Sequence, residues 1–244
     1  MSVENGPQLI VPAKSEPYYW SRELAWKIIE SAEFHPRGQE NLEIMKQTPV
    51  IFPFAPHCGH LDTAIVLKAF PEKFRPKLTL LAAGDYWFNN PFKYFVAIGM
   101  GKIYKLPRKK YTLELFRKVF YKEIPELLNK GESVLFSPEG TRSNPDTPFA
   151  ERKFKKGLGA LMIATEGQYP VIPIRIFGAE YLFPKKNWFP NFKLAKKAHI
   201  EVVFDDPAPY DPAKSWQGIT QEVQNRMVNL QPSAYLVLTS RDLS

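Results

Sequence analysis

Cysteine is nearly absent from this 244-residue chain, which contains only Cys58. A single thiol forms no intramolecular disulfide and excludes a zinc site built from four cysteines, so a reducing, cytoplasmic setting is expected. Long apolar runs are also missing, because Pro, Lys, Asp or Glu interrupts every hydrophobic stretch before about eighteen residues, and no membrane-spanning helix is predicted. The N-terminus lacks the basic and apolar segments of a signal peptide. Any membrane contact should therefore be peripheral, at the inner face of a membrane.

Acidic residues are too few to balance the basic ones, since 25 Asp and Glu stand against 33 Lys and Arg and give a net charge of +8. This charge favours an anionic partner, which can be nucleic acid, a phospholipid headgroup or a phosphorylated small molecule. Hydrophobic residues make up 44% of the chain, as in a globular domain. No repeat or low-complexity tract separates two domains. We expect an extended lead-in over residues 1–19 and one domain over residues 20–244.

Segments with strand and helix patterns alternate along the chain. An amphipathic helix is predicted around Leu24 and Ile28, with Ser21 as its cap. Strands are predicted at residues 50–54, 78–82, 102–105, 133–136, 171–176 and 199–204, and helices at residues 63–70, 90–98, 112–128, 158–165 and 219–228. Pro125 should kink the 112–128 helix, which is expected to bury Leu113 and Phe116. The alternation predicts an α/β fold with a central mixed, largely parallel sheet flanked by helices.

A polar loop, residues 56–62, follows the first core strand and contains His57 and Asp62. On an unbroken helix these two side chains would point about 140 degrees apart and would not meet. Pro56 and Gly59 disfavour a helix there and allow a tight turn that folds His57 back over Asp62. The carboxylate would then fix the imidazole tautomer and leave the other ring nitrogen as a general base toward a hydroxyl. Backbone N–H groups near this loop are the expected oxyanion donors.

Two other interpretations of this loop stay open. In the first, Asp62 only caps a helix and His57 is a polar turn residue. In the second, a metal-dependent hydrolase would draw its ligands from His57, Cys58, His60 and Asp62. The remaining histidines, His35 and His199, stand in no recognisable ligand pattern, which argues against zinc.

A second polar loop, residues 137–143, follows the strand predicted at 133–136 and places Glu139 and Arg142 close together. A guanidinium can bind a phosphate through two parallel hydrogen bonds. Lys155 and Lys156 open the next predicted helix, whose backbone N–H groups would face the same anion. The alternative is a solvated basic turn in which Glu139 and Arg142 pair structurally.

Over residues 48–178 the chain resembles the glycerolipid acyltransferase family, which includes the lysophosphatidate acyltransferases. His57 and Asp62 match the family's His-x4-Asp motif. Gly101 and Arg108, within GKIYKLPR, look like its second motif. Residues 138–143 closely match the third motif, and residues 171–174 match the fourth, a hydrophobic segment with proline. Four motifs in the right order are far more specific than any one of them.

The resemblance implies an O-acyltransferase in which His57 is the base and Asp62 its partner. It implies that the phosphate or glycerol portion of the acceptor is bound by Arg108, Glu139, Gly140, Thr141 and Arg142. Lys155 and Lys156, from their place at the start of the next predicted helix, are candidates for a further anion contact. The donor would be acyl-CoA or acyl-carrier protein, and the acceptor a hydroxyl of a lysophospholipid or related glycerol phosphate. Neither a cofactor nor a metal ion is expected.

Some positions depart from the family's pattern. Gly59 stands where many members have serine, His60 follows it, and Asp85 occupies a region where many have lysine. Because these positions lie near the expected acceptor site, the identity of the acceptor stays open. Cys58 is interpreted as a packing residue.

Residues 177–197 interleave aromatic and basic side chains, namely Tyr181, Phe183, Trp188, Phe189 and Phe192 with Lys185, Lys186, Lys193, Lys196 and Lys197. This mixture favours peripheral docking on an anionic membrane surface, although core aromatics with solvated lysines would give the same pattern. It is also compatible with stacking on single-stranded nucleic acid, so a non-enzymatic protein that binds nucleic acid or anionic membranes is the competing class. Nucleic acid is not expected as a partner, because no nucleic-acid motif accompanies the charge and the two polar loops would stay unexplained.

Overall fold

The computed structural model describes residues 8–10, 19–90, 94, 96, 97, 99–107, 112–182 and 198–234. In this part of the chain the centre is an eight-stranded sheet in the order β1-β5-β4-β6-β3-β7-β8-β2. The strands are β1 (Gln8–Ile10), β2 (Glu33–Arg37), β3 (Ile51–Ala55), β4 (Leu78–Ala83), β5 (Lys102–Leu106), β6 (Ser133–Phe136), β7 (Ile174–Phe177) and β8 (His199–Phe204). Only the β1–β5 and β7–β8 pairs described are antiparallel, which confirms the predicted mixed, largely parallel sheet.

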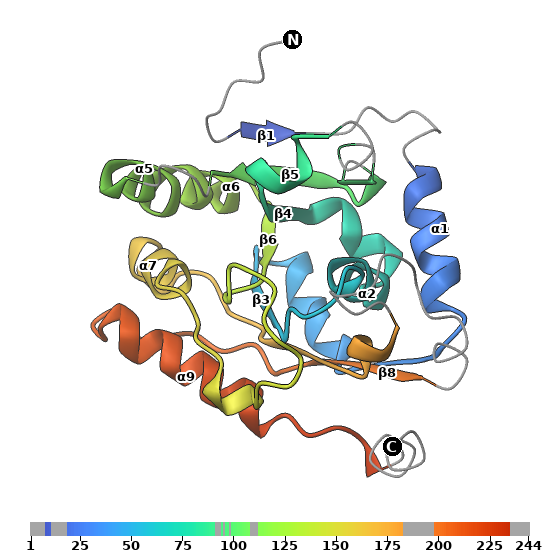
Figure 1. Ribbon diagram of the computed structural model, residues 1–244. Coiled ribbons are helices and arrows are strands. Elements are labelled where there is room, and N and C mark those ends of the chain that lie inside the picture. The colour runs from blue at the N-terminus through green and yellow to red at the C-terminus, as the bar shows by residue number, and fades with distance from the viewer. Residues whose placement is uncertain are drawn as a thin grey trace.

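Helices cover both faces of this sheet, and Figure 1 shows α1 and α2 on one side of it and α5, α6, α7 and α9 on the other. The first layer contains α1 (Tyr19–Ile29), α2 (Asp62–Ala69), α3 (Gly84–Trp87) and the 3-10 helices η2 (Gln39–Lys46), η3 (Glu72–Lys77) and η6 (Ala179–Tyr181). The second contains α5 (Leu113–Lys118), the π-helical η4 (Val119–Glu123), α6 (Ile124–Asn129), the 3-10 helix η5 (Phe149–Glu151), α7 (Gly157–Ala164) and α9 (Trp216–Asn229). Each layer packs its own hydrophobic core against the sheet. All five residues of β3 are buried, as expected for a strand covered on both faces.

Several local predictions differ from the structure. Ser21 is not the cap of the first helix, because α1 begins at Tyr19 and Ser21 lies buried inside it. Leu113 was expected to be buried, yet it is 59% exposed, because the buried face of α5 starts three positions later, at Phe116. Leu24, placed on the apolar face of the first helix, is 50% exposed, because Ser21, Ala25 and Ile29 form the buried face of α1. The strand predicted at 171–176 begins only at Ile174, since Pro173 has no N–H for a strand ladder. Part of the 90–98 helix lies outside the described residues.

The helix predicted at 112–128 is interrupted one turn before Pro125, where the π-helical segment Val119–Glu123 joins α5 to α6. Proline cannot donate to the carbonyl group four residues earlier, and its ring clashes there, so the wider π turn accommodates it. Phe116 is still buried in the core as predicted, and Val119 and Phe120 are buried beside it.

Gly159 allows α7 and α9 to approach backbone to backbone. A Cβ atom built on Gly159 would lie 2.2 Å from the carbonyl oxygen of Trp216 and 2.8 Å from its Cα. We expect Gly159→Ala to lower the free energy of unfolding by roughly 1–3 kcal/mol, measured by urea denaturation, because the two helices must separate. The matched control is Gly218→Ala on α9, whose new Cβ meets nothing closer than 3.5 Å. It should be neutral or stabilising by about 0.5–1 kcal/mol, and equal losses in both variants would contradict this account.

Candidate functional site

The two polar loops meet at the carboxyl ends of β3 and β6, because these two strands are parallel neighbours in the sheet. The carboxyl ends of parallel strands are where ligands bind in open α/β sheets. A backbone hydrogen bond joins the loops directly, since the N–H of Ser143 donates to the carbonyl oxygen of His57 at 2.8 Å. The structure therefore brings together two segments that are about eighty residues apart in the sequence.

His57 and Asp62 are in contact. The distance from His57 Nδ1 to Asp62 Oδ2 is 2.9 Å, and the same oxygen accepts the backbone N–H groups of Cys58 and Gly59 at 2.7 Å each. Asp62 is 1% exposed, whereas 24% of the His57 side chain is accessible. The carboxylate thus holds the ring through Nδ1, and Nε2 remains for a substrate. The tight turn needed for this contact forms between β3 and the start of α2.

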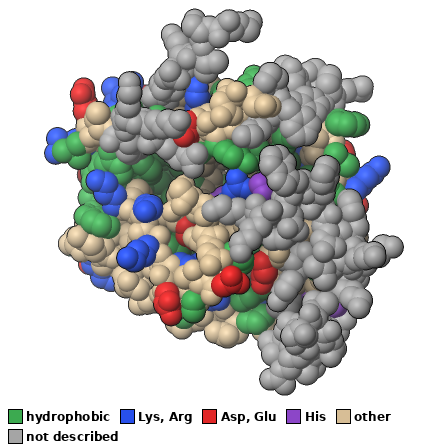
Figure 2. Space-filling model, viewed as in Figure 1, with side chains coloured by type: hydrophobic (Ala, Val, Ile, Leu, Met, Phe, Trp, Pro, Cys, Tyr) green, Lys and Arg blue, Asp and Glu red, His purple; other side chains and the backbone are tan. Residues whose placement is uncertain are grey.

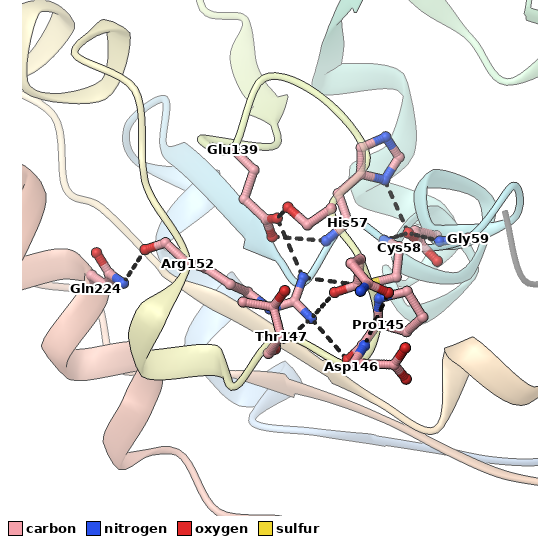
Figure 3. A network of polar contacts seen from close by, with 12 residues as sticks. His57, Cys58, Gly59, Glu139, Pro145, Asp146, Thr147, Arg152 and Gln224 are labelled. Carbon is pink, nitrogen blue, oxygen red and sulfur yellow. Dashed lines mark hydrogen bonds and ion pairs between the residues drawn. The ribbon is translucent and has the colours of Figure 1, made fainter.

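Glu139 lies behind the first loop and is 3% exposed. Its Oε1 accepts the backbone N–H of His57 at 2.9 Å, while Oε2 accepts the hydroxyl of Ser143 and lies 3.4 Å from Arg152 Nη1 (Figure 3). Glu139 was expected to contact the acceptor. The structure instead places its carboxylate against the backbone of His57.

The backbone N–H groups of His57, Cys58 and Gly59 are all bonded to carboxylates, the first to Glu139 and the other two to Asp62. These three groups were candidates for the oxyanion donors. Because each already has an acceptor, an oxyanion would have to be bound by other groups of the site.

A cavity of about 700 Å³ opens beside His57. Most of its wall is apolar and comes from strands β4, β5 and β6 and from the helices α5 and α7. The predicted site residues that line it are His57, Gly140, Thr141, Arg142, Lys155 and Lys156. Figure 2 shows hydrophobic side chains inside a hollow on the left of the molecule, with Lys and Arg side chains around it. His57 therefore lies where an apolar interior meets a basic rim.

Arg142 is held at the cavity wall by two rings. Its Nη1 lies 2.6 Å from Nδ1 of His60, and its guanidinium carbon lies 4.9 Å from the centroid of the Tyr86 ring. His60 and Gly59, two of the positions that depart from the family's pattern, also line the cavity. Arg108, predicted to join this group, lies outside the described residues.

A metal site at His57, His60 and Asp62 is not supported by the geometry. Among the described residues, the one group of three side chains whose metal-ligating atoms all lie within 4.8 Å of one another is Glu33, His35 and His199. These residues are on β2 and β8, at the opposite edge of the sheet from β1. The ring of His60 contacts Arg142 instead of joining the pair formed by His57 and Asp62.

Arg152 is a buried residue of the site that the sequence did not reveal. It is 7% exposed and contacts Cys58, Glu139 and three backbone carbonyl groups. In the sequence it is one more basic residue before Lys153 and Phe154, with no spacing pattern to separate it from solvated neighbours.

Burial raises the pKa of the Cys58 thiol to about 11, although the nearby Arg152 opposes the shift. At pH 7.5 roughly 100-fold less thiolate is present than for a thiol with the ordinary pKa, so Cys58 should react slowly with iodoacetamide. The rate should rise about tenfold per pH unit until the pH approaches the pKa, because the thiolate is the reacting form. Labelling followed by mass spectrometry checks this, with glutathione as the reference thiol. Labelling as fast as glutathione at pH 7.5 would contradict a buried packing role.

None of the helices in the described ranges is both long and apolar enough to cross a bilayer. The predicted membrane-docking segment, residues 177–197, lies mostly outside these ranges, since residues 183–197 are not described.

Comparison with known proteins shows two kinds of similarity, one to a family model and one to solved structures. A family model described as Acyltransferase matches residues 34–177. The fold resembles the crystal structure of the 1-acyl-sn-glycerophosphate (LPA) acyltransferase PlsC from Thermotoga maritima, with a TM-score of 0.55 and 18% sequence identity over 88% of this chain and 81% of that chain. A sequence search of curated proteins found no significant match.

Proposed function

Because the chain belongs to the acyltransferase family, we propose that it transfers a fatty acyl group from a thioester to a hydroxyl of a lysophospholipid or related glycerol-phosphate acceptor. The observation that carries this proposal is the contact between His57 and the buried Asp62, beside an apolar cavity with a basic rim. The structural similarity to a 1-acyl-sn-glycerophosphate acyltransferase supports the same substrate class.

His57 is the proposed general base. Its Nε2 takes the proton of the acceptor hydroxyl as the oxygen attacks the thioester carbonyl carbon, and the C–S bond breaks when the tetrahedral intermediate collapses. The imidazolium returns the proton to the departing thiolate, so that His57 ends the cycle neutral. Asp62 stabilises the imidazolium and keeps Nδ1 protonated. No protein nucleophile is needed, which agrees with the buried, weakly acidic thiol of Cys58.

The apolar wall of the cavity is the proposed site for the acyl chain. Each buried methylene group contributes about 0.8 kcal/mol, so an apolar cavity of this volume favours a long acyl chain over a short one. The donor is acyl-CoA or acyl-carrier protein, and no cofactor or metal ion enters the proposed reaction.

The basic rim is the proposed site for the phosphate of the acceptor. Arg142 offers a planar guanidinium for bidentate contacts, and Lys155 and Lys156 line the same cavity from the start of α7. Gly140 and Thr141 line the cavity beside Arg142. Arg108 is assigned to the same role from its motif alone.

Since the acceptor is a lipid, the proposed place of reaction is the cytoplasmic, inner face of a membrane. The interleaved aromatic and basic residues at 177–197 are the proposed contact with anionic headgroups. Binding to phosphatidylglycerol vesicles should weaken when Trp188→Ala is combined with Lys185→Glu and Lys186→Glu. Unchanged binding would remove this segment from the proposal.

The experiment that tests the function offers labelled acyl-CoA and acyl-carrier protein donors with a panel of lysophospholipid, glycerol-phosphate and polyol acceptors. Thiol release and labelled product are measured together, because product without an acceptor would indicate simple hydrolysis. Turnover with a phosphate-bearing acceptor supports the proposal. Absence of thioester consumption with every acceptor, together with salt-sensitive retention on nucleic acid, would favour the binding protein instead.

A further inference from the structure

A buried guanidinium connects the two loops of the site. Arg152 Nη1 lies 3.1 Å from Cys58 Sγ in the first loop and 3.4 Å from Glu139 Oε2 in the second. Its Nη2 faces three backbone carbonyl oxygens of the segment that follows the second loop, those of Asn144 at 3.1 Å, Pro145 at 3.3 Å and Thr147 at 3.1 Å. Figure 3 shows these contacts converging on one side chain. One arginine thus folds the segment after the second loop and joins it to the first.

Glu139, the carboxylate beside the Arg152 guanidinium, holds the backbone of His57. Glu139 accepts the N–H of His57 through Oε1 and the hydroxyl of Ser143 through Oε2. The N–H of Ser143 donates in turn to the carbonyl oxygen of His57. These bonds close a ring through His57, Ser143 and Glu139, in which the N–H and the C=O of His57 are both fixed.

The charges explain why Arg152 is needed beside this ring, against the carboxylate of Glu139. The Glu139 side chain is 1% exposed and that of Arg152 is 4% exposed, so neither is solvated by bulk water. A buried carboxylate without its cation is strongly destabilised, whereas a pair with its remaining donors and acceptors bonded is tolerated. Loss of Arg152 would therefore favour any movement that brings water to Glu139, and such movement breaks its bond to His57.

The helix α9 holds Arg152 from the other side. Gln224 Nε2 donates to the backbone carbonyl oxygen of Arg152 at 2.6 Å and to that of Ala150 at 3.4 Å. Gln224 itself is buried. The arginine is therefore anchored to the rigid part of the fold at its backbone and to the site at its guanidinium.

We propose that Arg152 is a positioning residue for acyl transfer: through Glu139 it fixes the backbone of His57, so that the imidazole meets the acceptor hydroxyl in one orientation. This inference rests on the proposed function and assigns Glu139 to the same positioning task instead of to the acceptor. Asp62 orients the ring, while Arg152 and Glu139 orient the backbone that carries it.

Cys58 provides a reporter that does not depend on activity, because it is the one cysteine of the chain and touches Arg152. We expect Arg152→Met to increase the rate of Cys58 labelling roughly tenfold or more, since the loop opens more often once the buried pair is broken. Removing the positive charge by itself would raise the thiol pKa further and slow the labelling. Faster labelling therefore reports opening of the loop and not a change in acidity.

In the acyl transfer assay, Arg152→Met should lower kcat about 100-fold with KM for both substrates within a few fold, because a misplaced base affects the reacting geometry more than binding. Arg152→Lys keeps the charge and should restore part of kcat. The matched control is Arg37→Met, which removes the arginine from another glutamate with a 1% exposed side chain, Glu201. Arg37 lies on β2 and Glu201 on β8, outside the two loops of the site. This variant should alter stability without changing kcat or Cys58 labelling.

If Arg152→Met does not fold, Glu139→Gln is tested in its place. The amide oxygen of the glutamine still accepts the N–H of His57, but its NH2 group is a donor and faces the donor groups of Arg152 and Ser143. Wild-type kcat and wild-type labelling in the folded variants would overturn the proposal, as would equal effects of Arg37→Met. If wild type shows no acyl transfer, the proposed function fails, while the labelling result still decides whether Arg152 holds the loop.

Discussion

Replacing His57 by alanine is expected to lower kcat by roughly 100-fold to 10,000-fold, the contribution of a well-placed general base. KM should change little, because the proposed sites for the acyl chain and the phosphate lie in other parts of the cavity. The fold should persist, since the ring is partly exposed and its backbone contacts to Glu139 and Ser143 do not involve the imidazole. Thiol release under saturating substrates measures the loss, and circular dichroism checks the fold.

His35→Ala is the control for this variant, because His35 is an exposed histidine on β2 at the opposite edge of the sheet from β1. It should keep wild-type kcat. Retained turnover in His57→Ala would rule out the assigned base, and it would leave the contact with Asp62 as a purely structural feature of the turn.

Making Asp62 neutral is expected to separate its electrostatic role from its structural one. In Asp62→Asn, one side-chain oxygen can still accept the N–H groups of Cys58 and Gly59, so the turn should form. The imidazolium loses its counter-charge, and kcat should fall by roughly 1,000-fold to 10,000-fold, as when the aspartate of a catalytic triad is neutralised. The free energy of unfolding should fall by only about 1–2 kcal/mol.

Asp62→Ala should differ from Asp62→Asn in stability rather than in rate. It leaves two buried backbone N–H groups without an acceptor, each worth roughly 1–3 kcal/mol, so urea denaturation should show a loss of about 2–6 kcal/mol. Equal stability of the two variants would mean that water replaces the carboxylate at the turn. Wild-type kcat in Asp62→Asn would show that the charge of Asp62 has no part in the reaction.

The family predicted from four short motifs is confirmed, and the parallel sheet could be predicted because strand and helix patterns alternate. The contact between His57 and Asp62 was also accessible, since both residues lie in one short loop where Pro56 and Gly59 favour a turn. In these cases the interactions that decide the structure lie within short segments, so the residues of each segment are enough to predict them.

What could not be predicted depends on residues distant in the sequence. Arg152 meets Cys58 across 94 positions, and nothing near Arg152 indicates that its side chain is buried. Glu139 faces the backbone of His57 rather than the cavity because β6 lies beside β3, which is a property of the sheet order. Strand β2 was missed because Pro36 and alternating charged residues do not look like a strand, although this composition is common at the edge of a sheet.

Strand β1 has a practical consequence for work with this protein. Its three residues form antiparallel pairs with β5, from Gln8 opposite Lys105 to Ile10 opposite Ile103. A shortened version that begins after Ile10 would leave main-chain donors and acceptors of β5 uncovered, and such a row recruits strands from other molecules. Truncations designed for crystallisation should therefore keep Gln8, and oligomers in a shorter version should be attributed to the bared strand before any physiological assembly is inferred.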